Sequence, residues 1–327
     1  MRRILVLASL AACGSDNTKT IDAAKAIDAP KPIDAMPDAL FDAPAPPPNA
    51  HRFVIDHEHQ PTNSTEARMY GLDLNGDATI DNQLGMVLAT FAGMGLSSQP
   101  GLDHAIDTGA IEILADVEAM DLTTAAQATV TLFDGANAMP APCHGGGDTT
   151  CRHHLAGTAT FDIATTSAHD TPLAGAIAAG VLDAGPGTLH LRSVILGAPV
   201  DLKLIGARVR LTQPSDPGIM TGVIAGAITQ AEIDASLIPA LQAAVTVQIA
   251  LDCGALTTPP GCGCADGSTG KTFVGLFDAN HDCAVTIAEI KNNALIISLL
   301  APDVTIDAMP ALSLGVGVSA VHAAFTP

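Results

Sequence analysis

Val-Asp-Leu-Lys-Leu-Ile-Gly-Ala-Arg-Val-Arg-Leu, residues 200–211, is the stretch that decides the fold. Polar and apolar residues alternate through most of it. A period of two places successive side chains on opposite faces of a strand, so this run is expected to lie half-buried in a sheet.

Other β-favouring runs repeat this signal along the chain. They occupy residues 111–117, 129–133, 157–163 and 189–194. Glycine and proline punctuate the later part of the chain at residues 185–187, 197–199 and 214–218, where turns are expected. Regular strands joined by short turns predict a mainly β fold, either a β-sandwich or a flattened barrel, with a few packed helices.

Three helices are expected against this sheet, over residues 81–94, 229–244 and 286–300. Thr229 and Glu232 have the spacing of a capping box at the start of the second helix, and Pro239 is expected to kink it. The other two helices follow acidic loops. The fold should therefore contain EF-hand-like loop-helix elements.

The first candidate for chemistry is the acidic loop at residues 278–289, Asp-Ala-Asn-His-Asp-Cys-Ala-Val-Thr-Ile-Ala-Glu. It resembles the twelve-residue EF-hand loop at positions 1, 3, 5, 8, 9 and 12, a spacing that points alternate oxygens at one Ca²⁺ ion. The expected ligands are the side chains of Asp278, Asn280 and Asp282, the carbonyl of Ala284, the hydroxyl or a bridged water of Thr286, and both carboxylate oxygens of Glu289.

Cys283 departs from the EF-hand pattern, which has glycine at this position. The backbone there usually has a positive φ, which costs a residue other than glycine about 1 kcal/mol. A disulfide from Cys283 is expected to hold the turn.

A second acidic loop runs from Asp73 to Leu84 and resembles the calcium loops of dockerins. Leu84 occupies the position of the bidentate acid, so this loop is expected to bind Ca²⁺ more weakly than the other. The predicted ligands are Asp73, Asn75, Asp77, the Thr79 carbonyl and Asp81.

The cysteine count predicts three disulfides in an exported chain. Cys143 and Cys151 form the natural local pair, whereas Cys262 and Cys264 are too close in sequence to be joined to each other. The pairing of the other four cysteines is left open, and a Zn²⁺ site built from those four is the rival interpretation. The cysteines concerned are Cys143, Cys151, Cys253, Cys262, Cys264 and Cys283.

Composition bounds the partners of the protein. The chain has 34 acidic and 14 basic residues and a formal net charge of −20, which repels nucleic acid and favours cations. It has no Trp and only one Tyr, so aromatic platforms for single-stranded nucleic acid are scarce.

The N-terminus reads as an export signal. Two arginines precede a short apolar run that ends at Cys13, and the run is too short to span a bilayer. Leu-Ala-Ala-Cys at residues 10–13 resembles the lipobox of bacterial lipoproteins, which implies removal of residues 1–12, lipidation of Cys13 and anchoring in a membrane. Gly14 after the cysteine favours the outer membrane, by resemblance to lipoprotein sorting rules.

Residues 13–50 repeat short Asp, Ala and Pro units and end in three prolines. Such units bury too little apolar surface to offset the entropy of ordering, so this segment is predicted to be a disordered tether. Residues 51–327 then form a single β-rich domain that carries both calcium loops.

The order of these features resembles predicted lipoproteins of myxobacteria-like organisms. The shared order is the lipobox, the Asp-Ala-Pro tether, the two calcium loops around a β-rich middle, Cys262-Gly263-Cys264, and the tail at residues 314–318. The resemblance implies no activity. The paired repeat of dockerins is missing, so their role in assembly is not implied either.

Several weaker signals are set aside. Residues 265–272 match a relaxed phosphate-loop pattern but follow a Pro-, Gly- and Cys-rich stretch in place of a buried strand, so no nucleotide is expected. Histidine clusters on a surface usually bind nothing, although they suit Zn²⁺ or Cu²⁺; the clusters are His57 with His59, and His144 with His153 and His154.

No nucleophile elbow or zinc-protease motif is legible, so no enzyme is expected. The sequence favours a lipid-anchored extracytoplasmic module, stabilised by Ca²⁺ and disulfides, that meets a protein or glycan partner. The alternatives are a cell-envelope hydrolase with a site of scattered acids and histidines, because paired carboxylates are plentiful, and a carrier of lipophilic ligands, because the middle of the chain is aliphatic.

Overall fold

The computed structural model describes residues 49–93, 97–195, 197–254, 258–259 and 261–327. The chain divides into two units, Met1–Asp42 and Ala43–Pro327, and the second contains all of the described residues. The export signal, Cys13 and the predicted tether up to residue 48 lie outside the described residues.

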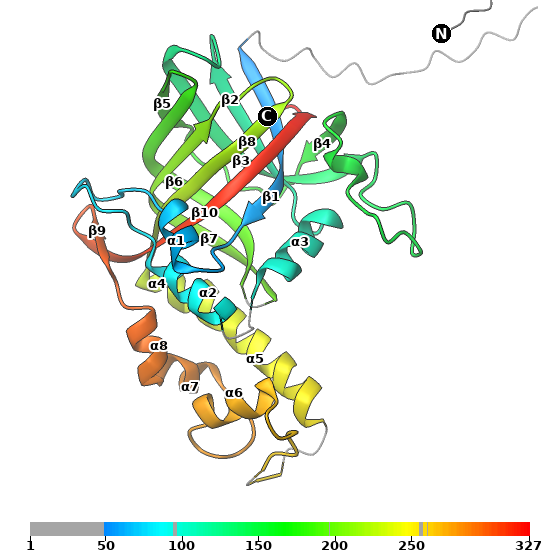
Figure 1. Ribbon diagram of the computed structural model, residues 1–327, viewed down its shortest axis with the longest axis vertical. Helices are drawn as coiled ribbons and strands as arrows, with labels where there is room; N and C mark the ends of the chain where they lie inside the picture. Colours follow the sequence, from blue (N-terminus) through cyan, green and yellow to red (C-terminus); the bar gives the residue numbers. More distant parts are fainter. Residues whose placement is uncertain (1–48, 94–96, 196, 255–257, 260) are drawn as a thin grey trace, which may run out of the picture. The chain divides into compact units, whose positions relative to one another are not determined.

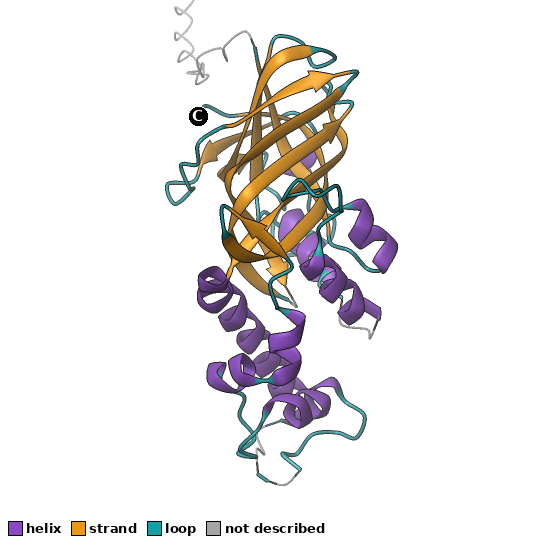
Figure 2. Ribbon diagram, turned by 90° about the vertical axis from the view of Figure 1, so that its left-hand side faces the viewer, coloured by secondary structure: helices purple, strands orange, loops and turns teal. Residues whose placement is uncertain are grey.

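The second unit is built on a closed antiparallel β-barrel (Figures 1 and 2). Of the ten strands in the sheet, β4 (Ala159–Ile163) and β9 (Val304–Ile306) lie off the closed path, which leaves eight. Each of the eight pairs with the next, and the last pairs with the first. They are β1 (Ala50–His59), β2 (Ile113–Ala119), β3 (Ala125–Met139), β5 (Leu173–Ala178), β6 (Val181–Ile195), β7 (Ala198–Thr212), β8 (Gly218–Thr229) and β10 (Met309–Ala324).

The predicted mainly β fold is therefore confirmed, and strand β7 shows why it forms. Leu202 and Leu204 are fully buried, whereas Asp201 and Lys203 between them are exposed. Gly206, with φ of 58°, has no partner across β6, because Ile205 pairs with Thr188 and Ala207 with Gly187. This one-residue bulge shifts the alternation, so that later apolar residues of β7 also face inward.

Aliphatic side chains fill the barrel from all sides. Directly opposed residues share a face of a sheet, so the pairings identify the inward positions on each strand. Those positions belong to one hydrophobic cluster of buried residues, represented on six strands by Phe53, Leu132, Leu191, Leu204, Ile224 and Leu314.

A small polar network enters this interior. The register of β1 shifts between Ile55 and His57, which leaves Asp56 without an opposed residue on β10. Glu58 consequently points to the same side as Phe53 and Ile55 and is completely buried. Its Oε1 accepts a hydrogen bond from the Ser193 hydroxyl at 2.6 Å, and that hydroxyl accepts from the Gln60 amide at 2.9 Å.

Two groups of helices surround the barrel. Helices α1 (Ser64–Met69) and α2 (Gln83–Gly93) pack on β10, and α3 (Gln99–Asp107) packs on β1 and β6. The others gather beyond one end of the barrel (Figure 1). They are α4 (Gln230–Glu232), the π-helical segment Ile233–Leu237, α5 (Ile238–Cys253), α6 (Thr269–Phe277), α7 (Ile287–Asn292) and α8 (Ala294–Leu299). A short 3-10 helix, His153–Leu155, precedes β4.

Two of the helix predictions need refinement. The helix expected over residues 286–300 is broken at Asn293, which ends α7 in an extended conformation and caps α8 with its side chain. The helix that begins after Thr229 passes through a π-helical turn just before Pro239. A π turn is one way to accommodate a proline that lacks an N–H donor.

The stretch Gln230–Cys253 has the length and composition of a membrane-spanning helix. Core helices of globular proteins pass the same test. In this structure it packs against β7, α6 and α7.

Candidate functional site

The loop at residues 278–289 is folded by hydrogen bonds from its own backbone to the predicted ligand side chains. The Asp278 carboxylate accepts hydrogen bonds from the N–H groups of Asp282 at 3.0 Å and Cys283 at 2.8 Å. Side-chain oxygens of the next two candidate ligands also accept from backbone N–H groups two residues ahead, Asn280 from Asp282 and Asp282 from Ala284, both at 2.9 Å. These bonds make the side chains of alternate residues accept from the backbone of the same loop.

Glu289 closes this loop from the start of α7. Its Oε1 accepts from the backbone N–H of Ala279 at 3.1 Å and of Asn280 at 3.3 Å, and its Oε2 accepts from the N–H and hydroxyl of Thr286, each at 2.9 Å. The carboxylate that was expected to bind Ca²⁺ through both of its oxygens therefore lies beside the second and third residues of the loop. These hydrogen bonds, led by the one from the Thr286 N–H, lower the pKa of Glu289 and keep it ionised.

The loop that begins at Asp73 repeats this geometry. The Asp73 carboxylate accepts from the N–H of Gly76 at 2.6 Å and of Ala78 at 2.9 Å. Asn75 accepts from Asp77 at 3.0 Å, and Asp77 accepts from Thr79 at 2.7 Å. The Thr79 hydrogen bond also lowers the pKa of Asp77.

The two loops agree at several positions although they lie on opposite sides of the β-rich middle in sequence. The fourth position has positive φ in both, 82° at Gly76 and 60° at His281. The sixth position does too, 65° at Ala78 and 68° at Cys283. In both, the third-position Asn donates from Nδ2 to the fifth-position Asp at 3.1 Å. Agreement at these positions identifies a shared loop conformation.

Leu84, in the position where an EF-hand has its bidentate acid, is a core residue, 2% exposed. Asp81 takes the corresponding place in the loop. Its Oδ2 accepts from the Leu74 N–H at 2.8 Å, and Leu74 is the second residue of its loop, as Ala279 is of the other. The sequence pattern alone did not identify this substitution, because Asp81 and Glu289 occupy different positions in the twelve-residue template.

Carboxylates crowd around Asp81. Burial raises the pKa of Asp81, the Leu74 hydrogen bond opposes that rise, and repulsion from Asp77, Asp303 and Asp73 adds to it. Asp303 is hydrogen-bonded to strand β10. Its carboxylate accepts from the Ser313 N–H at 2.7 Å and from the Ser313 hydroxyl at 2.5 Å. Sequence reasoning missed Asp303, because nothing near it in the chain resembles a ligand pattern. A cation among these groups would relieve the repulsion.

The disulfides place the loop at residues 278–289 in a cross-linked region. Cys143 pairs with Cys151, Cys253 with Cys264, and Cys262 with Cys283. Cys262 and Cys264 are not joined to each other, as predicted. Cys283 is bonded at the residue whose φ is 68°, so the cross-link sits on the turn that it was expected to hold. With all four sulfurs oxidised, the rival Zn²⁺ interpretation of these cysteines is not supported.

The loop that begins at Asp73 is anchored to the barrel through Asn82, a residue that the sequence pattern did not single out. Its Nδ2 donates to the Ala67 carbonyl at 2.9 Å, and its Oδ1 accepts from the Gly85 N–H at 3.0 Å. Asn82 thus ties the end of the loop to both α1 and α2.

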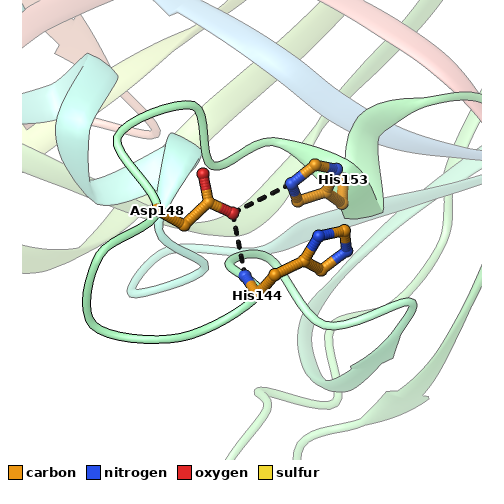
Figure 3. Close-up of side chains that lie close together, drawn as sticks. All are labelled: His144, Asp148 and His153. Atoms are coloured by element: carbon orange, nitrogen blue, oxygen red, sulfur yellow. Dashed lines mark hydrogen bonds and ion pairs between the residues drawn. The ribbon is translucent and has the colours of Figure 1, made fainter.

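A third group of candidate ligands lies in the loop closed by Cys143 and Cys151, which is separate from the two acidic loops. His144, Asp148 and His153 come together there (Figure 3). His57 and His59 also stack, with ring centroids 5.5 Å apart, on the outer face of β1. His154 is buried against Phe161 and does not join His144 and His153.

Comparisons with protein families, with curated proteins and with solved structures find no match to this chain.

Proposed function

We propose that this protein is an extracytoplasmic, lipid-anchored, calcium-binding structural and interaction module. The observation that carries the proposal is the shared conformation of the two acidic loops. Each carries three carboxylates, one Asn side chain and a backbone carbonyl at the predicted ligand positions, and these are the hard oxygen donors that Ca²⁺ prefers.

The location of the loops supports a structural role for the ion. The first joins α1 to α2, which pack on β10, and the second joins α6 to α7 at the Cys262–Cys283 cross-link. An ion in each loop would hold two helices in register and neutralise carboxylates that otherwise repel one another. Loops of extracellular modules bind Ca²⁺ with dissociation constants of about 10⁻⁴ to 10⁻³ M, which suits permanent occupation outside the cell.

The setting of the module follows from the N-terminal sequence. The lipobox-like Cys13 would attach the chain to the outer membrane, and residues 13–50 would hold the barrel away from the membrane surface. Its surface would meet a protein or glycan partner. The buried aliphatic cluster that fills the barrel favours this module over the lipophilic-carrier alternative.

Calorimetric melting of the full-length protein in EGTA and in millimolar Ca²⁺ tests the proposal. We expect Ca²⁺ to raise the melting temperature by several degrees, because the ion binds the native state alone. Asp81→Asn and Glu289→Gln should each lose part of that rise. Asp266→Asn, which alters a carboxylate that is 96% exposed and outside both loops, is the matched control. An unchanged melting temperature in Ca²⁺ would overturn the proposal.

A further inference from the structure

We propose that His144, Asp148 and His153 form a separate site for a transition-metal ion of the Zn²⁺ type. The three residues each offer one ligand atom, and these atoms lie within 4.8 Å of one another. Ligands of a tetrahedral zinc ion bind at about 2.0–2.2 Å and so lie about 3.3 Å apart. The three atoms are therefore close enough for side-chain rotation to bring them to that spacing.

The two histidines lie beside each other. Their rings stack with centroids 3.7 Å apart and planes 6° from parallel. An imidazole nitrogen binds a metal in the plane of its ring, so one ring has to rotate for both nitrogens to face one ion. His153 Nε2 lies 3.0 Å from Asp148 Oδ2, so a proton now occupies the place between them that a metal ion would take (Figure 3). Imidazole nitrogen is a ligand for Zn²⁺ and Cu²⁺ and a poor one for Ca²⁺, so the chemistry of this site differs from that of the acidic loops.

The carboxylate of the site is held in place before any metal binds. Asp148 Oδ2 accepts from the His144 N–H at 2.8 Å, and Oδ1 accepts from the Thr150 N–H at 2.8 Å and hydroxyl at 3.1 Å. Such second interactions orient a ligand and raise its affinity for metal.

The backbone around the site is also restrained. The Cys143–Cys151 disulfide closes the loop on either side of Asp148. At the other end, the N–H of His153 donates to the Pro142 carbonyl at 3.2 Å and the N–H of Arg152 donates to Asp107 at 3.0 Å. Open space surrounds the three glycines that separate His144 from Asp148, namely Gly145, Gly146 and Gly147. This space leaves room for His144 to adjust to an ion.

The side chains of His153 and Asp148 are 31% and 11% exposed. Three protein ligands on a partly exposed site leave a fourth position for water. The other histidine pair is a weaker candidate, because Glu58 between His57 and His59 faces the barrel interior and cannot join them.

Zn²⁺ binding by the full-length protein tests this inference. Titration against a chromophoric zinc indicator, in millimolar Ca²⁺ to fill the acidic loops, gives the affinity and the number of sites. Replacement of Zn²⁺ by Co²⁺ adds the visible spectrum of a tetrahedral ion. We expect one site whose affinity falls about ten-fold or more in His153→Ala and in Asp148→Asn.

His169→Ala is the matched control, because His169 is an exposed histidine outside the cluster, and it should bind as the unaltered protein does. Far-UV circular dichroism establishes that each variant is folded. The inference is wrong if the unaltered protein binds no Zn²⁺ at submillimolar concentration, or if His144→Ala/His153→Ala binds with unchanged affinity. Loss of binding in His57→Ala/His59→Ala alone would assign the ion to β1 and would equally overturn it.

Discussion

The side chain of Asn82 hydrogen-bonds both backbone polar groups of Gly315, which lies 233 residues away in sequence. Its Oδ1 accepts from the Gly315 N–H at 2.8 Å, and its Nδ2 donates to the Gly315 carbonyl at 2.9 Å. Strand β1 ends at His59 opposite Gly317, so the amide of Asn82 continues the pairing of β10 where β1 stops. A Cβ on Gly315 would lie 2.1 Å from the Tyr70 carbonyl, which explains why glycine is needed there.

Asn82→Ala is therefore expected to destabilise the protein by about 2–4 kcal/mol, because it leaves two or more buried backbone groups without partners. Denaturant unfolding measures the change. Asn63→Ala removes a side chain that caps α1 at an exposed position and should cost about 1 kcal/mol. Equal losses in the two variants would contradict the special role of Asn82.

Adding the EF-hand acid to the loop that begins at Asp73 should not strengthen its binding of Ca²⁺. Leu84→Glu places a carboxylate at the template position, yet Leu84 lies in the core and Asp81 already reaches the loop. We expect no gain in Ca²⁺ affinity and a loss of stability of about 3 kcal/mol or more, measured by calorimetric titration and thermal melting. Leu84→Met keeps the volume apolar and should cost less than about 1.5 kcal/mol. A tighter site in Leu84→Glu would show that Asp81 does not replace the acid.

The strain at Cys283 can be measured directly. In a Cys262→Ser background, which removes the cross-link, Cys283→Gly should be more stable than Cys283→Ala by up to about 1 kcal/mol, because only glycine adopts a φ of 68° without steric cost. Urea unfolding in Ca²⁺ gives the difference. If the alanine variant is the more stable, the turn at this position is not the source of strain.

The buried acid inside the barrel predicts how stability changes with pH. Burial raises the pKa of Glu58 from its ordinary 4.5 to about 8, although the Ser193 hydrogen bond opposes the rise. Between these values the unfolded chain has released the proton and the native state retains it, so the free energy of unfolding falls as pH rises, by up to about 1.4 kcal/mol per pH unit.

Glu58→Gln should therefore flatten the fall in stability between about pH 5 and pH 8, measured by denaturant unfolding at a series of pH values. Burial also raises the pKa of Glu112, to about 7, so Glu112→Gln is the control for the contribution of the second acid. A slope that Glu58→Gln leaves unchanged would mean that Glu58 is ionised in the native protein.

Sequence reasoning located strand β7, which has one solvent-exposed face, and missed strand β10, which is covered on both faces. Strand β7 alternates along almost its whole length, because its outer face meets solvent. In β10, residues 311–318 are all buried, since the barrel interior covers one side and Tyr70, Asn82 and Asp303 cover the other. Its alternation disappears, and glycines at 315 and 317 weaken the β signal further.

The candidate site was also predicted only in part. The spacing of Asp and Asn residues in both acidic loops is local in sequence, so it indicated two loops of similar conformation, and the structure contains them. The replacement of the last acid by Asp81 depends on where α2 packs, which is a tertiary contact that the spacing of residues does not show. The grouping of His144 with His153 and the Cys143–Cys151 pair beside it were predicted from the sequence, whereas Asp148 was not.

Closure of the barrel by its first and last strands also has a consequence for synthesis. A ribosome completes β1 long before β10, so the seam between these two strands stays open until β10 has been made. Until then β1 and β8 each present a row of unpaired backbone groups, which is the surface on which chains aggregate. Loss of β10 through a premature stop codon would fix the protein in that open state, so a truncated product is expected to be a substrate for chaperones and proteases.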